Sequence, residues 1–87
     1  MNLVTVLLNK SQLMSDYEIP VPSDMNLISL SITSPQKISD EEISTVAFLA
    51  IQSVRRPDQF EESRSYLDGR RVTFSIKTVG GTITYPK

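Results

Sequence analysis

SDEEISTVAFLAIQSV, residues 39–54, predicts a helix around which we expect the rest of the chain to be organised. Ser39 and Glu42 have the spacing of a capping box, in which each side chain accepts a hydrogen bond from the backbone N–H of the other residue. Ile38 and Ile43 occupy the two positions of the hydrophobic staple that accompanies such a box. Two sequence signals, the capping box and the hydrophobic staple, therefore indicate where the helix starts.

One side of the predicted helix is apolar over its whole length. Its residues recur at the spacing that lines one face of an α-helix, which predicts packing against a sheet. These residues are Ile43, Val46, Ala47, Ala50, Ile51 and Val54.

The opposite side of this helix carries no charge between Glu42 and Arg55. A helix face in contact with solvent normally carries charged side chains. We therefore expect either that a partner covers this side, or that its hydroxyl and amide groups solvate it unaided and Phe48 is singly exposed. The residues in line along this side of the helix are Ser44, Phe48, Gln52 and Arg55.

Four segments have the composition of strands. Residues 2–8 are almost wholly apolar and rich in β-branched side chains, which favours a central strand covered on both faces. Residues 27–33 alternate between apolar and hydroxyl side chains, which predicts a half-buried strand. Residues 71–78 alternate in the same way, and the Gly-Gly pair at 80–81 is expected to join them to a strand over 82–85 by a two-residue hairpin.

The expected register of this hairpin follows from the turn. A loop at residues 80–81 pairs Val79 with Thr82, which places Ile76 opposite Tyr85. The apolar residues of both strands then lie on one face.

A second, shorter helix is predicted over residues 57–67. Pro57 disfavours continuation of the first helix and suits the first position of a new one. Phe60 and Leu67 are its apolar anchors, and Asp68-Gly69 is expected to turn the chain out of it.

These elements predict one α+β domain over residues 1–87. We expect a four-stranded antiparallel sheet with strand order 2-1-3-4 and the main helix packed on one face, because the most apolar strand then lies in the middle. The expected core contains Val4, Ile28, Leu30, Val46, Ile51, Phe74 and Ile76.

Residues 9–25 are rich in serine, aspartate and proline, which predicts a long irregular excursion. Long loops in small domains are often functional, which makes the excursion a site candidate with Tyr17 and Ile19 as its binding residues. The alternative is that Leu13, Met14 and Ile19 simply cover the sheet.

The composition excludes several classes of enzyme. The chain contains no histidine and no cysteine, which removes the usual general base, the commonest metal ligand and the thiol nucleophile. The acids near Asp40 and Asp58 lie at helix starts, where they are expected for structural reasons. We predict no catalytic activity, no metal site and no cofactor.

The formal net charge is −1, which provides no overall attraction to nucleic acid or to an anionic membrane. The apolar run at residues 3–8 is too short to cross a bilayer and lacks the flanks of a secretory signal. We expect a soluble, cytoplasmic protein.

Five arginines within seventeen residues, with Phe60 and Tyr66 among them, support one alternative. Arginine together with aromatic rings can hold a nucleic-acid backbone and stack on its bases. Four acids in the same segment reduce its charge to +1, which favours a salt-bridged surface instead. The arginines are Arg55, Arg56, Arg64, Arg70 and Arg71.

A small protein-binding module is the function that these features favour. Aromatic residues and arginine are enriched where binding energy concentrates, and charge is depleted at the centres of interfaces. We expect an inhibitor, adaptor or subunit of a larger complex, such as a phage or mobile-element accessory factor, with a protein target or a second copy as partner. The expected interface consists of Tyr17, Ser44, Phe48, Gln52, Arg55 and Tyr66.

Overall fold

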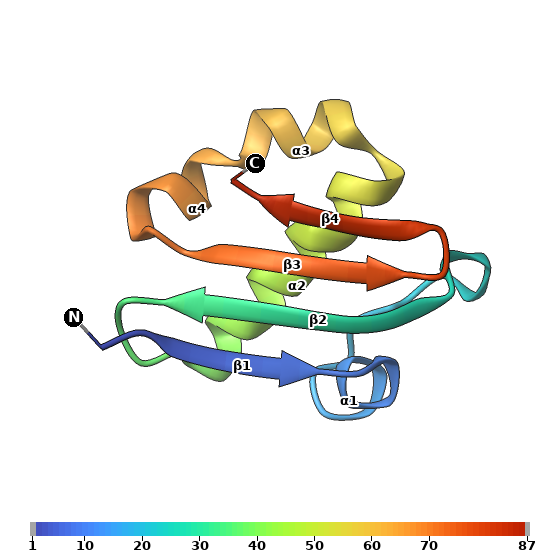
Figure 1. The fold of residues 1–87 in the computed structure, drawn as a ribbon, viewed down its shortest axis with the longest axis horizontal. Helices are drawn as coiled ribbons and strands as arrows, with labels where there is room; N and C mark the ends of the chain where they lie inside the picture. The colour runs from blue at the N-terminus through green and yellow to red at the C-terminus, as the bar shows by residue number, and fades with distance from the viewer. Residues whose placement is uncertain (1, 87) are drawn as a thin grey trace.

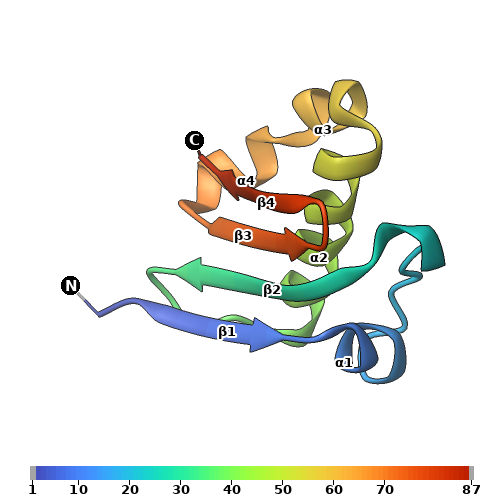
Figure 2. The ribbon, with the colours of Figure 1, turned by 45° about the vertical axis from the view of Figure 1, so that its right-hand side comes forward.

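Four antiparallel strands form a single sheet in the order β1-β2-β3-β4 (Figure 1). The computed structural model describes residues 2–86. Helix α2 runs along one face of this sheet, and α3 and α4 follow it toward the β4 side (Figure 2). The elements are β1 (Val4–Leu8), α1 (Lys10–Ser15), the 3-10 helix η1 (Ser23–Met25), β2 (Leu27–Ser34), α2 (Asp40–Arg55), α3 (Pro57–Ser63), α4 (Ser65–Arg70), β3 (Thr73–Thr78) and β4 (Gly81–Tyr85).

The predicted α+β class and antiparallel sheet are confirmed, but the predicted strand order 2-1-3-4 is wrong. β2 lies between β1 and β3, where Leu30 pairs with Leu8 on one side and Ile76 on the other. β1 is an edge strand with Leu7 67% exposed. The apolar composition of residues 2–8 thus does not indicate a central strand, because β2, the next strand in the chain, pairs with β1, and β3 is then added to the other side of β2.

The predicted register of the β3–β4 hairpin is wrong by two residues. Thr78 pairs with Gly81 and Phe74 pairs with Tyr85, so the turn consists of Val79 and Gly80. Gly81 has a φ of 143°, a conformation that glycine adopts readily. A shift of two residues leaves every side chain on its face, because side chains alternate with a period of two.

The core differs from the prediction at two positions. Ile28 is 48% exposed because the register between β2 and β3 shifts between Leu27 and Ser29, and Leu27 is buried instead. Val4 is 38% exposed because β1 is an edge strand. The five remaining predicted core residues are buried: Leu30, Val46, Ile51, Phe74 and Ile76.

Helix α2 begins where the sequence predicts. Ser39 is its N-cap and accepts a hydrogen bond from the backbone N–H of Glu42 at 3.2 Å. Val46, Ala47 and Ala50 are fully buried in the hydrophobic core shared with the sheet. The predicted apolar stripe is therefore buried, apart from the partly buried Val54.

The segment 9–25 is more ordered than its composition predicts. Asn9 and Gln12 form a complete capping box that starts α1, with bonds of 2.8 and 3.0 Å between side chain and backbone N–H. Leu13 is completely buried, and its carbonyl accepts a hydrogen bond from the N–H of Ile19 at 2.9 Å. The helix was missed because it has only one buried anchor.

The predicted second helix is two short helices, α3 and α4, separated at Arg64. Phe60 and Leu67 are both buried, as expected of its anchors. The chain leaves α4 through Arg71 in a left-handed conformation with a φ of 57°, not through Gly69.

Candidate functional site

A groove of about 430 Å³ lies beside the outer side of α2. Phe48, which is 50% exposed, lies in its wall. Apolar side chains and prolines form part of this groove, and arginine and glutamine side chains form the rest. We call it the Phe48 groove; it is lined by Pro20, Pro22, Phe48, Ile51, Gln52, Arg55, Arg56 and Gln59.

The wall opposite α2 is an extended segment after α1. Ile19 and Val21 are buried in the core, while Pro20 is exposed and Pro22 partly buried. Alternation of this kind is what an extended backbone produces, and proline favours that backbone in the residue before it. The segment therefore holds two prolines against the groove by anchoring the residues between them in the core.

Arg55, which lines the groove, forms an ion pair with a residue outside it. The guanidinium of Arg55 lies 2.7 Å from the carboxylate of Asp24 in η1 and connects that helix to α2. Both side chains are largely exposed, so the pair adds little to stability. Arg56 also lines the groove and makes no ion pair within residues 2–86. The lining of the groove thus carries the positive charge of Arg56 without an ion-pair partner among the described residues.

Gln52 lines the groove, and the oxygen of its side chain is buried. Its amide nitrogen donates to the Gln59 side chain at 3.4 Å, whereas its carbonyl oxygen is buried without a hydrogen-bond partner among residues 2–86. A buried acceptor without a partner costs about 1 to 3 kcal/mol. This oxygen has almost no exposed surface, so a ligand in the groove does not reach it.

The structure brings together three of the six predicted interface residues: Phe48, Gln52 and Arg55. Ser44 and Tyr17 are partly buried and do not line the groove. Tyr66 lies in α4, where the guanidinium carbon of Arg70 is 3.9 Å from the centre of its ring. Pro20, Pro22 and Gln59 were missed, because the sequence does not show which segment packs beside α2.

The five arginines of the nucleic-acid alternative border three separate hollows. Arg55 and Arg56 line the Phe48 groove. Arg64 lines a pocket beside β4 and lies 3.2 Å from Glu61. Arg70 and Arg71 line a hollow near the start of α2.

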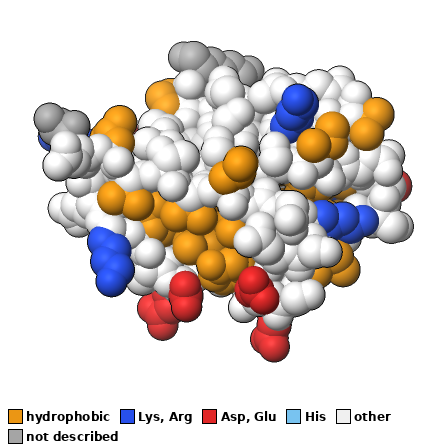
Figure 3. Space-filling view, turned by 60° about the horizontal axis from the view of Figure 1, so that its bottom comes forward, with side chains coloured by type: hydrophobic (Ala, Val, Ile, Leu, Met, Phe, Trp, Pro, Cys, Tyr) orange, Lys and Arg blue, Asp and Glu red, His pale blue; other side chains and the backbone are white. Residues whose placement is uncertain are grey.

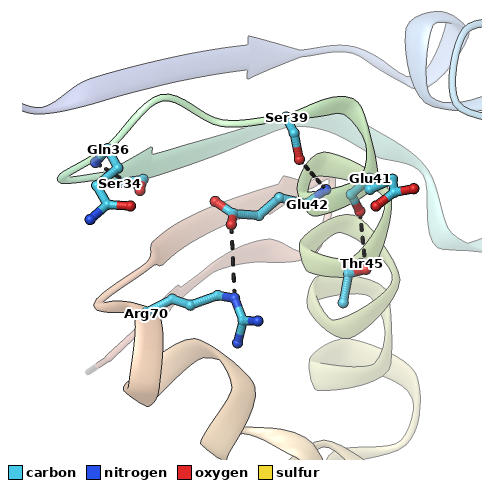
Figure 4. Close-up of polar contacts among 7 residues, drawn as sticks. All are labelled: Ser34, Gln36, Ser39, Glu41, Glu42, Thr45 and Arg70. Atoms are coloured by element: carbon cyan, nitrogen blue, oxygen red, sulfur yellow. Dashed lines mark hydrogen bonds and ion pairs between the residues drawn. The ribbon is translucent and has the colours of Figure 1, made fainter.

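The hollow near the start of α2 is lined in part by Glu42, the second residue of the predicted capping box. Glu42 does not bond back to Ser39; its carboxylate lies 3.9 Å from the guanidinium of Arg70 (Figure 4). Ser39 still accepts from the Glu42 backbone N–H, so half of the box is formed. Glu42 connects the start of α2 to the end of α4.

A second pocket, of about 490 Å³, lies among aromatic rings that the sequence places far apart. Phe60 meets Phe74 and Tyr85 edge-on, with ring centres 5.9 and 5.2 Å away. The Tyr85 hydroxyl hydrogen-bonds to Asp68. Burial, together with this bond and the charge of Asp68, raises the pKa of Tyr85 above its ordinary value of 10.0.

Within residues 2–86, no helix is long and apolar enough to cross a membrane, and no three carboxylates gather as a metal site would require. Comparison with protein-family models, curated proteins and solved structures finds no match to this chain.

Proposed function

We propose that this chain is a non-enzymatic protein-binding module that holds an extended segment of a partner protein in the Phe48 groove. The observation that carries the proposal is the position of Phe48, a half-exposed aromatic ring in a groove with prolines in its opposite wall. Aromatic residues in a partly enclosed groove are typical anchors of protein interfaces.

The groove specifies the chemistry of the partner segment. An apolar side chain fits between Phe48, Ile51 and the prolines, where it would leave water. An acidic residue next to the apolar one would pair with Arg56. The proposed ligand is thus a short segment with an apolar anchor and an acidic flank.

A module of this kind works by occupying a surface of its target. The inhibitor, adaptor and subunit roles share this requirement, and none needs a cofactor or a metal. The absence of histidine and cysteine from the sequence supports a role in binding over one in catalysis.

The proposal is tested by selecting displayed random peptides on the wild-type protein. We expect enrichment of peptides with an apolar residue beside an aspartate or glutamate. Phe48→Ala should weaken their binding by about 1 to 3 kcal/mol, or roughly 5- to 150-fold, because it removes the anchor.

Ile28→Ala is the matched control, since Ile28 is 48% exposed against 50% for Phe48 and does not line the groove. It should leave peptide affinity unchanged. Peptides that bind both variants equally well, or a selected motif without an acidic flank, would count against the proposed groove.

A further inference from the structure

The outer edge of β1 is open and apolar. Leu3 is 60% exposed and Leu7 67% exposed, and no charged residue or proline occurs between residues 2 and 9. Natural edge strands usually carry a lysine, a proline or a bulge that prevents pairing with another strand. In Figure 3, which brings the lower edge of Figure 1 forward, apolar side chains gather on this side of the molecule between charged groups.

The other edge of the sheet differs. β4 is followed at once by Pro86, and the Tyr85 ring packs against Phe60 with the ring centres 5.2 Å apart. Proline cannot donate a hydrogen bond to a neighbouring strand. An unprotected edge is therefore a property of β1 and not of the sheet in general.

The sequence of the open edge is a palindrome. Leu3-Val4-Thr5-Val6-Leu7 reads the same in both directions. A two-fold interface places one surface against itself, so it requires a self-complementary surface. Antiparallel pairing of two such strands about their middle residue places every residue opposite one of the same type.

We propose that two copies of this chain pair antiparallel through β1, with the two-fold axis at Thr5, and so join their sheets into one. Leu3 then lies opposite the partner's Leu7, and Val4 opposite the partner's Val6. Thr5 lies opposite the partner's Thr5. Paired threonines and paired apolar residues on neighbouring strands are stabilising contacts.

The pairing would continue a row of threonines that each copy already contains. The Thr5 hydroxyl lies 3.0 Å from the Thr33 hydroxyl of β2, and Thr33 pairs with Thr73 of β3. The same face of β1 carries Leu7, which pairs with Ser31. A second copy would extend this hydroxyl-bearing face of the sheet and cover the exposed leucines.

The length of the edge sets the expected strength of the dimer. Five paired residues extend over about 17 Å, with side chains on both faces of the ribbon. A stable interface covers about 800 Å² on each partner, which is more than one short strand provides. We therefore expect a dimer that forms in the micromolar range and dissociates on dilution.

A charge exchange at the two-fold axis tests the proposal. Thr5 is exposed, so lysine or glutamate can be accommodated there in the monomer. Thr5→Lys and Thr5→Glu should each raise the dissociation constant at least tenfold in analytical ultracentrifugation, because the axis places like charges opposite each other. An equimolar mixture of the two variants should dimerise again, since opposite charges then meet.

Thr84→Lys on β4 is the matched control and should leave dimerisation unchanged, because that exposed threonine lies on the far edge strand. A wild-type monomer at several hundred micromolar would overturn the proposal. So would a dimer that tolerates both Thr5 variants, or a mass that grows beyond two copies. Circular dichroism shows whether each variant folds.

A second measurement tests the register even if the charged variants do not fold. The chain has no native cysteine, so one introduced thiol can be cross-linked without background. Thr5→Cys should react with a short bismaleimide to a covalent dimer at least tenfold faster than Leu7→Cys, since only position 5 faces itself. Equal rates would overturn the register.

Discussion

Replacing Leu13 by alanine asks whether the segment that carries the proline wall of the Phe48 groove is a packed part of the fold. Leu13 is completely buried and is the one buried residue of α1. Truncation of a buried leucine to alanine typically lowers the free energy of unfolding by 2 to 5 kcal/mol, because it removes apolar contacts and leaves a cavity. A domain of this length has a total of roughly 4 to 13 kcal/mol.

The expected loss is large enough to measure by either of two methods. A loss of about 3 kcal/mol corresponds to a fall in melting temperature of roughly 12 to 24 °C, at about 4 to 8 °C per kcal/mol for a domain of this size. Thermal unfolding followed by circular dichroism, or urea denaturation at constant m value, reports it.

Met14→Ala is the control in the same helix. Met14 is 47% exposed, so its truncation removes far less buried surface and should cost under about 1.5 kcal/mol. If the two variants melt within a few degrees of each other, Leu13 is not packed in the core. The segment 9–25 would then be the loose excursion that its composition predicts, and the groove would lose its second wall.

Two further predictions concern ionisable groups. Because the pKa of Tyr85 is higher in the folded chain, the unfolded chain ionises first. The free energy of unfolding of the wild type should therefore fall as pH rises from the unfolded pKa toward the folded pKa, that is, above pH 10. Tyr85→Phe should remove this part of the loss. Urea denaturation between pH 8 and 11 measures this, and identical pH profiles for variant and wild type would contradict it. For the nucleic-acid alternative, we expect binding of labelled oligonucleotides at low salt to be weaker than micromolar, because the arginines border separate hollows. Tighter binding that falls steeply with salt and is abolished by Arg55→Glu with Arg56→Glu would favour that alternative.

Local signals predicted the main helix correctly. A cap at Ser39, an apolar stripe and a proline at residue 57 are all close in sequence to the helix that they delimit. Such signals act through neighbouring backbone groups, so they can be read without knowledge of the rest of the fold. The exposure of Phe48 followed from the same periodicity.

Strand order could not be read in this way. The composition of residues 2–8 shows that the segment is apolar, but not whether its apolar side chains are covered by this chain or by another. Leu3 and Leu7 are exposed in the single chain. A continuous apolar run is compatible with a central strand and equally with an edge that is paired between copies.

The candidate site depended on packing between distant segments. Phe48 is 28 residues from Pro20 in sequence, and both line one groove. The aromatic pocket likewise joins Phe60, Phe74 and Tyr85 from three elements. Contacts of this kind have no local pattern, which is why the predicted interface included Tyr17 and Tyr66 and omitted the prolines.

The sequence by itself determined where the main helix begins, which of its sides is buried and which face of β3 points inward, because these follow from capping and from the periods of helix and strand. Only the tertiary structure decided which strand lies at the edge, that Leu13 anchors a helix and that Pro20 and Pro22 lie beside Phe48. Those outcomes depend on which distant apolar surfaces exclude water together, and the hydrophobic effect that drives this is non-directional and leaves no spacing in the chain.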